Sequence, residues 1–369
     1  MEVAVITRHA IANYGSLLQA AATQNALETL GHNCRIIDYV RPGEVCTQLH
    51  KSQLQQKPRW NRTPLRRRVY STLCYTENVM AGRLFESARR QMLHLTAPYS
   101  TAQELTANGP KADVYMTGSD QVWGPMEDGS YDPVYRLTFA PEGAKKVAYA
   151  ASFGSTELSK PLRGQFCRDL RQYATITIQE DSAIALLHQL GLEGKQVIDP
   201  VLLPDDAFWQ SLLEPINAAP GSYFLVYQMH KDPALCAYAK AAAKAAGKPL
   251  LRLSASVHQA SWGGKFIYAP TPGQFLHYIK NAACVITDSF HGTAFSLRFG
   301  VPFAEVLLTN CTGTCNHSLL TLTGLQSRLV TDPADTALTT TPINYAPVHK
   351  KIEAARTASL SLLREMIEK

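Results

Sequence analysis

The sequence predicts an α/β protein with two Rossmann-like, doubly wound domains that face each other across a cleft. Short apolar runs alternate with amphipathic or alanine-rich stretches along the chain, which is the pattern of parallel strands connected by helices. The alternation stops at a turn-rich segment, Glu214 to Gly221, and then starts again. A length of 369 residues suits two domains of ordinary size.

The expected N-terminal domain covers residues 1–215. Its strands are expected at 3–7, 34–40, 112–117, 147–152, 176–179 and 196–203, and its helices at 17–30, 160–173 and 182–190. Gly31, directly after the first helix, is a usual helix-stop residue. A basic insert at about 42–95, with Pro58, Pro64 and two helical stretches, interrupts this pattern.

The expected C-terminal domain covers residues 216–346. Its strands are expected at 223–228, 250–255, 284–287 and 304–308, and its helices at 233–246, 274–281 and 293–299. Gly247 and Gly300 end two of these helices. Residues 347–369 form a final amphipathic helix in this interpretation.

The composition excludes several classes of protein. A hydrophobic fraction of 46% with 18% charged residues excludes a disordered chain or a coiled-coil rod. Apolar runs stay well short of the ~20 residues that cross a bilayer. The first residues lack the features of a secretion signal, so a cytoplasmic protein with reduced cysteines is expected. Cys311, Cys315 and His317 lack a second ligand pair at a standard spacing, so no metal is expected.

The positive charge is concentrated in one segment. The net charge of the chain is +6, and residues 42–95 alone hold ten Lys or Arg side chains against three acids. Such a segment suits an anionic partner: a membrane surface, a lipid-linked phosphate or a nucleic acid. A solvated helix face explains it equally well. No nucleic-acid partner is expected, because the segment contains no aromatic platform and no recognisable nucleic-acid module.

Candidate site residues follow from the expected topology. Ligands of doubly wound sheets bind beyond the carboxyl ends of the strands. The polar residues that follow the expected strands are Asn13 and Gly15; Gly118, Ser119 and Asp120; Ser152; Gln179 and Glu180; Asp199; His230 and Lys231; and Asp288, Ser289 and His291.

The most informative stretch is DSFHGT, residues 288–293, which runs from a buried strand into a helix. Free backbone N–H groups and the helix dipole favour an anion such as phosphate at this point. His291 is a candidate for proton transfer there. In the structural alternative, Asp288 or Ser289 caps the helix and His291 packs. The turn also contributes the expected substrate-binding residues Ser289, Phe290, Gly292 and Thr293.

Two further loops carry polar groups after strands. In TGSDQVWG, residues 117–124, Asp120 could accept a proton from a hydroxyl, although an Asx-type turn with a buried Trp123 explains the loop equally well. In the NYGS loop, Gly15 permits a tight turn, and Asn13 and Ser16 could bind a ligand or brace the loop. The dinucleotide, P-loop and G-x-S-x-G signatures are absent from the sequence.

Taken together, these stretches resemble the polysaccharide pyruvyl transferase family. The resemblance rests on residues 1–31, DVYMTGSDQVW, VAYAASFG, QVIDPVLL and ITDSFHGTAFSLRFGVPF, and it matches the basic insert poorly. It implies a GT-B-like fold with the active site between two domains. It also implies phosphoenolpyruvate as donor, a sugar of a surface polysaccharide or of its lipid-linked precursor as acceptor, and a pyruvate ketal as product.

The resemblance implies roles for particular residues. His291 corresponds to the essential histidine and would transfer a proton or stabilise the leaving phosphate. The chemistry of ketal formation also needs a base, and we expect Asp120 to act as base toward the sugar and Asp288 to hold His291 in one tautomer. No cofactor or metal is needed for this reaction. Weak, reversible contact of the Arg66–Arg68 cluster with an anionic membrane surface is also expected.

Two departures from the family pattern concern the donor. Characterised members often carry Arg-x-His where this chain has Ser289-Phe290-His291, and many carry Arg-Glu where it has Gln179-Glu180. Either the phosphate is held by Arg298, Lys231, Arg252, Arg8 or the helix N-terminus, or the donor differs. His230 is expected among the substrate-binding residues. The alternatives are a GT-B glycosyltransferase that uses a nucleotide sugar and a non-catalytic protein of polysaccharide assembly.

Overall fold

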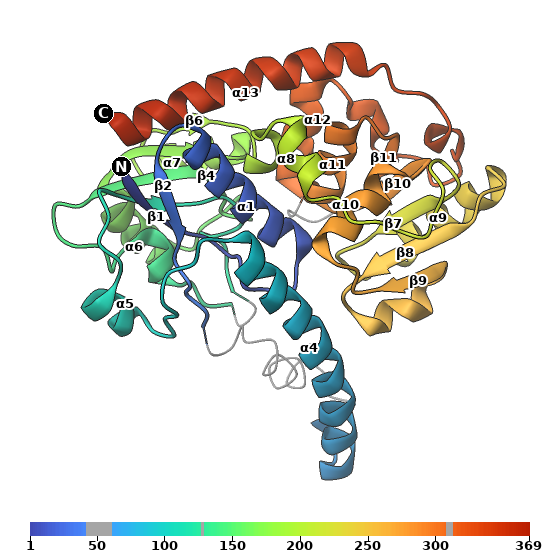
Figure 1. Ribbon diagram of the computed structural model, residues 1–369, viewed down its shortest axis with the longest axis horizontal. Coiled ribbons are helices and arrows are strands. Elements are labelled where there is room, and N and C mark those ends of the chain that lie inside the picture. Colours follow the sequence, from blue (N-terminus) through green and yellow to red (C-terminus); the bar gives the residue numbers. More distant parts are fainter. Residues whose placement is uncertain (42–60, 127–128, 308–312) are drawn as a thin grey trace.

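The computed structural model describes residues 1–41, 61–126, 129–307 and 313–369 (Figure 1). These residues form two parallel sheets covered by helices. The strand order is β2-β1-β3-β4-β5-β6 in the first sheet and β11-β10-β7-β8-β9 in the second. In each sheet the chain adds strands first toward one edge and then, from the starting strand, toward the other edge. This is the doubly wound topology. The expected fold class is therefore confirmed.

The first sheet is built by the N-terminal half of the chain. Its strands are β1 (Glu2–Ile6), β2 (Asn33–Ile36), β3 (Val114–Thr117), β4 (Lys145–Ala151), β5 (Tyr173–Ile178) and β6 (Lys195–Gln196). The helices are α1 (Tyr14–Thr29), α5 (Ala102–Asn108), α6 (Lys160–Leu170), α7 (Asp181–Gln189) and α8 (Asp206–Ser211), with short 3-10 turns at Pro133–Arg136 and Pro200–Leu202.

The strand expected at 196–203 is wrong beyond Gln196. Pro200 cannot donate to a sheet ladder, and it begins the 3-10 turn instead. The carboxylate of Asp199 caps that turn by accepting a hydrogen bond of 2.9 Å from the Val201 amide. The apolar residues after Pro200 are buried all the same, so the pattern indicated burial correctly and the backbone conformation incorrectly.

The second sheet is built by the C-terminal half. Its strands are β7 (Phe224–Tyr227), β8 (Leu250–Ser254), β9 (Lys265–Tyr268), β10 (Cys284–Thr287) and β11 (Phe303–Glu305). The helices are α9 (Pro233–Ala245), α10 (Pro272–Lys280), α11 (Phe290–Phe299) and α12 (Thr314–Thr323), with 3-10 turns at Val257–Trp262, Gln326–Arg328 and Ala337–Thr339. The sequence analysis missed β9 and α12. Leu308, the end of the expected strand 304–308, lies outside the described residues.

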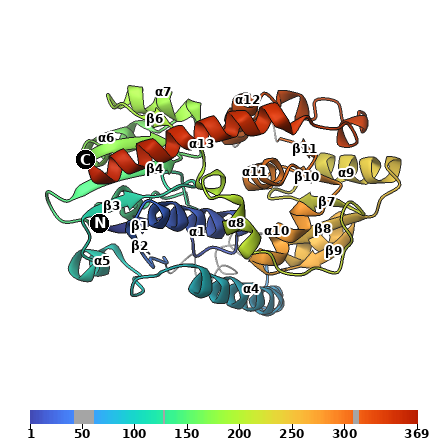
Figure 2. The ribbon, with the colours of Figure 1, turned by 45° about the horizontal axis from the view of Figure 1, so that its top comes forward.

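The last helix, α13 (Tyr345–Glu368), connects the two halves. It begins beside α12 and ends beside the first sheet (Figure 2). Lys145 of β4 donates a hydrogen bond of 2.9 Å to the Ile367 carbonyl, and the Ile198 amide donates one of 3.2 Å to Ser359 Oγ. Both halves therefore share one hydrophobic core. The domain limits at 215 and 346 stay predictions.

The described part of the insert contributes one long helix, α4 (Pro64–Met92). Two helical stretches were expected in the insert as a whole, and its residues 42–60 lie outside the described residues. The base of α4 packs on the body: Phe85 is buried and its ring centroid lies 4.9 Å from that of Tyr14. Arg89 makes a buried ion pair with Asp38 and contacts His9 Nε2 at 3.2 Å. The first half of α4 projects away from the body (Figure 1). None of the described helices is both long and apolar enough to cross a bilayer.

Candidate active site

A cavity of about 220 Å³ lies between the two halves, at the carboxyl ends of β1, β3, β5, β7 and β10. The residues that line it are Arg8, Ile11, Asn13, Ser16, Asp120, Gln121, Gln179, Met229, His230, Asp288, Ser289, Phe290, His291, Cys315 and Asn316. Nine of the sixteen expected site residues are in this set. The strand-end rule therefore located the cavity.

Two helix N-termini meet at this cavity. Asn13 caps α1, and its side-chain oxygen accepts hydrogen bonds from the amides of Gly15 (2.8 Å) and Ser16 (3.3 Å). Ser289 caps α11 in the same way through the Gly292 amide, at 3.4 Å. The positive ends of both helix dipoles therefore face the same small volume, which suits an anionic ligand.

His291 lies between these two helix ends. A Cβ atom on Gly15 would lie 2.1 Å from His291 Nδ1, so the imidazole occupies the space that a side chain at position 15 would need. Gly15 does not line the cavity itself, but it gives His291 its position. The His291 Nε2 atom is buried without a hydrogen-bond partner among the described residues. A ligand in the cavity is a natural partner for that nitrogen.

Asp120 also lines the cavity. Its φ of 79° lies in the left-handed region, which is unfavourable for a residue with a side chain and is often found at functional sites. Ser16 Oγ donates a hydrogen bond of 2.5 Å to Asp120 Oδ2, and the Gln121 amide donates one of 2.8 Å to Oδ1. The carboxylate is thus held in one orientation and has lone pairs left for a substrate hydroxyl.

Asp288 has a different partner from the one expected. Its carboxylate accepts hydrogen bonds from the amides of Met229 (2.6 Å) and His230 (2.9 Å), and lies 3.2 Å from His230 Nδ1. This contact raises the pKa of His230. The expected role of Asp288 in holding His291 is therefore wrong, because the carboxylate is committed to the loop after β7.

A buried carboxylate, Asp199, interacts electrostatically with His291. It accepts hydrogen bonds from Ser119 Oγ (2.9 Å) and Gln179 Nε2 (3.1 Å). Burial raises the pKa of Asp199, and the charge of His291 opposes that shift. Ser119 therefore orients Asp199 and does not line the cavity itself, whereas Gln179 both lines the cavity and binds Asp199. Gly118 is also structural, since a Cβ there would approach Thr7 Cβ at 3.0 Å.

Among the four cations considered for the donor, Arg8 lines the cavity. Arg298 is at the far end of α11, where it makes an ion pair of 2.8 Å with Asp206. Arg252 is buried and donates to Gln228 Oε1 at 2.7 Å. Lys231 is exposed and outside the lining. The expected binding roles of Arg298 and Lys231 are not supported by this geometry.

Gly292 and Thr293 lie behind the cavity rather than in its wall. A Cβ on Gly292 would lie 2.5 Å from Thr287 Oγ1, so this glycine lets α11 pack closely on β10. The Thr293 side chain is fully buried in the second half of the chain. Both residues were expected to contact the substrate. They lie outside the cavity lining, and they pack within the turn that positions His291.

The first turn of α12 contributes two residues that the sequence analysis missed. Cys315 and Asn316 line the cavity. Cys315 Sγ donates to the buried carboxylate of Glu180 at 3.3 Å, and burial raises the pKa of both groups. No sequence signal marked α12, because its short TCNHSLLTLT segment is rich in residues of low helix propensity. Clusters of three or more metal-ligating side chains do not occur in the described part of the chain.

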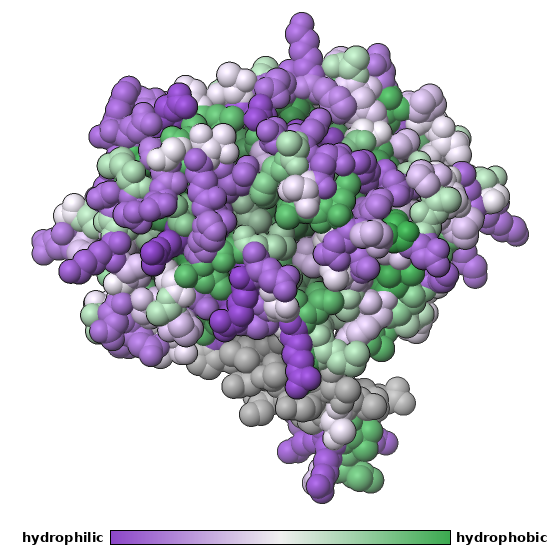
Figure 3. Space-filling view, in the orientation of Figure 1, coloured by the Kyte–Doolittle hydropathy of each residue, from purple (hydrophilic) through white to green (hydrophobic). Residues whose placement is uncertain are grey.

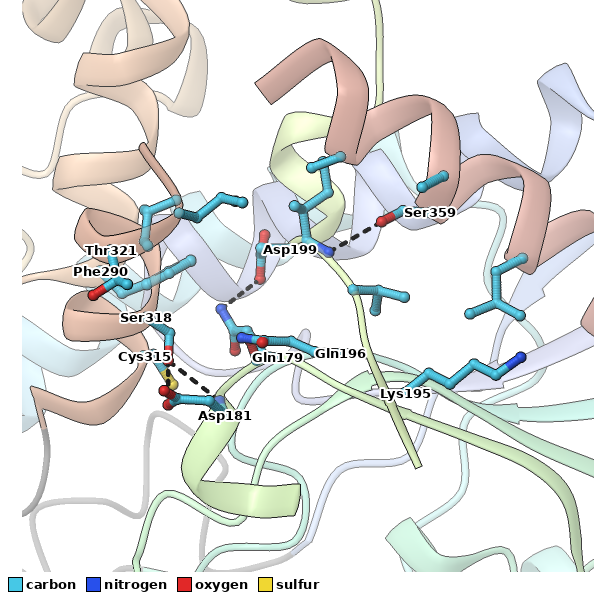
Figure 4. Close-up of a pocket in the computed structure, with 17 residues that line it drawn as sticks. Gln179, Asp181, Lys195, Gln196, Asp199, Phe290, Cys315, Ser318, Thr321 and Ser359 are labelled. Carbon is cyan, nitrogen blue, oxygen red and sulfur yellow. Dashed lines mark hydrogen bonds between the residues drawn. The ribbon is translucent and has the colours of Figure 1, made fainter. Parts of the chain in front are cut away.

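A second cavity, of about 370 Å³, lies on the other side of Gln179, Phe290 and Cys315, which line both cavities. Figure 4 shows its wall, where Ser318 Oγ donates to Asp181 at 2.6 Å and connects α12 to α7. Apolar side chains of α12 and α13 line much of the rest. Gln179, Phe290 and Cys315 therefore separate the site cavity from this second cavity, which α13 lines.

Known structures share this architecture. The chain is similar to Arabidopsis thaliana UGT89C1 complexed with UDP-L-rhamnose, with a TM-score of 0.52 and 10% identity over 99% of this chain and 98% of that one. It is also similar to a putative UDP-N-acetylglucosamine 2-epimerase from Listeria monocytogenes, with a TM-score of 0.50 and 12% identity over 97% of this chain and 90% of that one. At these identities the likeness shows the GT-B-like fold alone.

Sequence comparison is more specific. No curated protein matches the chain. A family model described as polysaccharide pyruvyl transferase matches residues 13–307, from the cap of α1 to the residues just after β11. Of the described strands this range contains all except β1, and it also contains Asp120 and His291. A match over this much of the chain shows that the protein belongs to the polysaccharide pyruvyl transferase family.

Proposed function

We propose that this protein transfers the pyruvyl group of phosphoenolpyruvate to a sugar of a cell-surface polysaccharide or of its lipid-linked precursor, and forms a cyclic ketal. The observation that carries the proposal is the meeting of two helix N-termini around His291, in a cavity that Asp120 also lines. This arrangement offers an anion site and a base in one cavity. Membership of the family supports the same reaction.

The reaction requires an acid, a base and an anion clamp. The methylene carbon of phosphoenolpyruvate gains a proton, and the neighbouring carbon becomes electron-poor. One sugar hydroxyl attacks that carbon as it loses its proton, the C–O bond to phosphate breaks, and a second hydroxyl closes the ketal ring. Free phosphate leaves with the electron pair of the broken bond.

The cavity residues supply these three functions. In this proposal the N–H groups of α1 and α11 and the guanidinium of Arg8 hold the anionic donor. His291 Nε2 transfers a proton at the donor, since that nitrogen has no protein partner among the described residues. Asp120, held by Ser16, accepts the proton of the attacking hydroxyl.

The positions of the family arginines are filled differently in this chain. The Gln179 amide binds Asp199, and Ser289 caps α11. In this proposal Arg8 and the helix ends take over the grip on the phosphate. Backbone N–H groups can then donate hydrogen bonds to the phosphate in place of the bidentate hydrogen bonds that a guanidinium at position 179 or 289 would make.

The test is mass spectrometry of sugar and lipid-linked sugar pools incubated with phosphoenolpyruvate. We expect a product heavier by one pyruvyl unit less water, together with release of phosphate. Thermal shift with phosphoenolpyruvate and with nucleotide sugars separates the alternatives, because a bound ligand stabilises the folded state. Stabilisation by nucleotide sugars alone would favour a glycosyltransferase. No stabilisation and no phosphate release would favour a non-catalytic assembly protein.

A further inference from the structure

The projecting half of α4 has an unusual surface. Leu65, Val69 and Met80 are 74%, 44% and 57% exposed, respectively, and are among the most exposed large apolar side chains of the described residues. Successive residues of a helix are about 100° apart, so these three side chains fall within about 60° of one another around the axis. We call these three side chains the apolar stripe. Met80 lies about 22 Å along the helix axis from Leu65, and the exposed Thr72 lies between Val69 and Met80 on the same face.

Arginines border this stripe. By the same geometry, Arg66 and Arg68 flank the pair formed by Leu65 and Val69. Arg67 is on the opposite side, where its Nε donates a hydrogen bond of 2.9 Å to the Asn61 carbonyl. From residue 61 to residue 76 the sequence contains four arginines and no acidic residue. Figure 3 shows hydrophilic and hydrophobic side chains side by side on this projection.

The base of α4 has a fixed relation to the candidate active site. Phe85 packs on Tyr14, which follows the cavity residue Asn13. Arg89 contacts His9, which follows the cavity residue Arg8. The base of α4 therefore contacts the β1–α1 loop at both of its ends. A surface that binds the other end of α4 would lie at a defined position relative to the cavity.

We propose that the first half of α4 docks on an anionic membrane surface, with the apolar stripe in the interface and the arginines on the lipid headgroups. Exposed apolar side chains beside arginines suit a membrane interface, since each basic residue near an anionic surface strengthens binding. A second copy of the chain is a poorer partner, because it would bring another four arginines to the same face. The inference does not depend on the proposed reaction, since its test measures binding alone.

The test is sedimentation of the full chain with vesicles of phosphatidylglycerol and phosphatidylcholine, and with vesicles of phosphatidylcholine alone. We expect binding to the anionic vesicles at low salt and release at 1 M salt, since the Debye length falls from ~30 Å at 0.01 M to ~3 Å at 1 M. Replacing Arg66, Arg67 and Arg68 by glutamate should weaken partitioning by about a hundredfold.

A matched control makes the same change in net charge, three basic residues to glutamate, at positions away from α4. Lys240 and Lys244 on α9 and Lys350 on α13 are exposed, and their replacement by glutamate should leave most of the binding intact. Leu65→Gln, Val69→Gln and Met80→Gln together should weaken binding without any change of charge. Equal sedimentation of the wild type and the arginine variant would overturn the proposal. So would loss of binding to the same extent in the lysine control, or a stable dimer in solution without vesicle binding.

Discussion

His291 combines a fixed position with an unused hydrogen-bonding atom. Its ring rests against Gly15, and its Nε2 has no partner among the described residues. We expect His291→Ala to reduce turnover about 10²–10⁴-fold, the usual contribution of one acid–base group. Because no hydrogen bond of Nε2 is lost, the melting temperature should change little.

The matched control for this variant is His188→Ala, at an exposed position of α7. Both variants are compared by steady-state kinetics and by thermal melting. A loss of turnover below about tenfold in His291→Ala, with an unchanged melting curve, would show that His291 does not transfer the proton.

Gly15 has no side chain, and the imidazole of His291 occupies the space that a side chain there would need. In Gly15→Ala the new Cβ would coincide with the imidazole of His291, which must then move. Alanine favours a helix by up to about 1 kcal/mol over glycine, so the fold should tolerate the change. A displacement of about 1 Å at a catalytic group can cost about a hundredfold in rate, and we expect a loss of that size in kcat.

Gly164→Ala is the control for this substitution. Gly164 is also inside a helix, α6, and a Cβ at this position would meet no atom within 4 Å. It should raise stability slightly and leave turnover unchanged. Equal turnover in the two glycine variants would contradict the inferred position of His291.

Arg8 is the cation that we expect to bind the donor. Hydrogen bonds to charged groups contribute about 1.5–3 kcal/mol, so Arg8→Gln should raise the donor KM by roughly ten- to a hundredfold. Arg298→Gln removes the same charge at the far end of α11, where Arg298 pairs with Asp206, and should leave the donor KM unchanged. The measurement is initial rate against donor concentration for both variants. The reverse ranking would place the donor elsewhere.

At the scale of elements, β11 and α12 are joined by a buried carboxylate. Glu305 at the end of β11 accepts a hydrogen bond from Asn316 of α12, and burial raises the pKa of Glu305 from 4.5 to about 7. The folded state therefore binds this proton more tightly than the unfolded state. As a result, the free energy of unfolding should fall as pH rises from about 4.5 through 7.

Glu305→Gln should remove this pH dependence. At pH 8 the variant should be more stable than the wild type, by on the order of 3 kcal/mol at most, and at pH 4 the two should be similar. Denaturant unfolding across this pH range measures the difference. Glu353→Gln, at an exposed position paired with Arg356, is the control and should leave the pH profile unchanged. An unchanged profile in Glu305→Gln would mean that Glu305 is not the group responsible.

At the scale of the whole molecule, α13 makes the two halves one cooperative unit. Val348 and Ile352 are buried near its start, and Leu363, Met366 and Ile367 are buried near its end. Leu363→Ala should reduce the free energy of unfolding by about 2–5 kcal/mol, the usual cost of a large buried cavity. Since both halves share one core, a single unfolding transition should move as a whole.

Leu65→Ala is the control for this truncation, because Leu65 is 74% exposed. It should change stability by no more than about 0.5 kcal/mol. Far-UV circular dichroism and tryptophan fluorescence, followed in the same denaturant titration, report the transition. Two separate transitions, with one of them unaffected by Leu363→Ala, would show that the halves unfold independently.

Much of the fold could be predicted from local pattern. Buried strands such as β3, β7 and β10 are continuous apolar runs, and glycines end α11 and α9. The errors have local causes too. The apolar run after Gln196 was expected to be a strand, but Pro200, capped by Asp199, starts a 3-10 turn there. The edge strand β9 is too short for an alternation of apolar and polar residues to be recognised.

The sequence by itself determined which loops surround the cavity, because strands of one direction place their carboxyl ends on one edge, and this rule selected Asp120 and His291. It also indicated the family, through stretches whose order and spacing are specific. Only the tertiary structure decided which side chains meet. It paired Asp288 with His230 instead of His291, placed Gly15 under the imidazole, and separated Arg8 from Arg298. Such pairings join residues far apart in the chain, so they depend on the packing of the two sheets rather than on any local pattern.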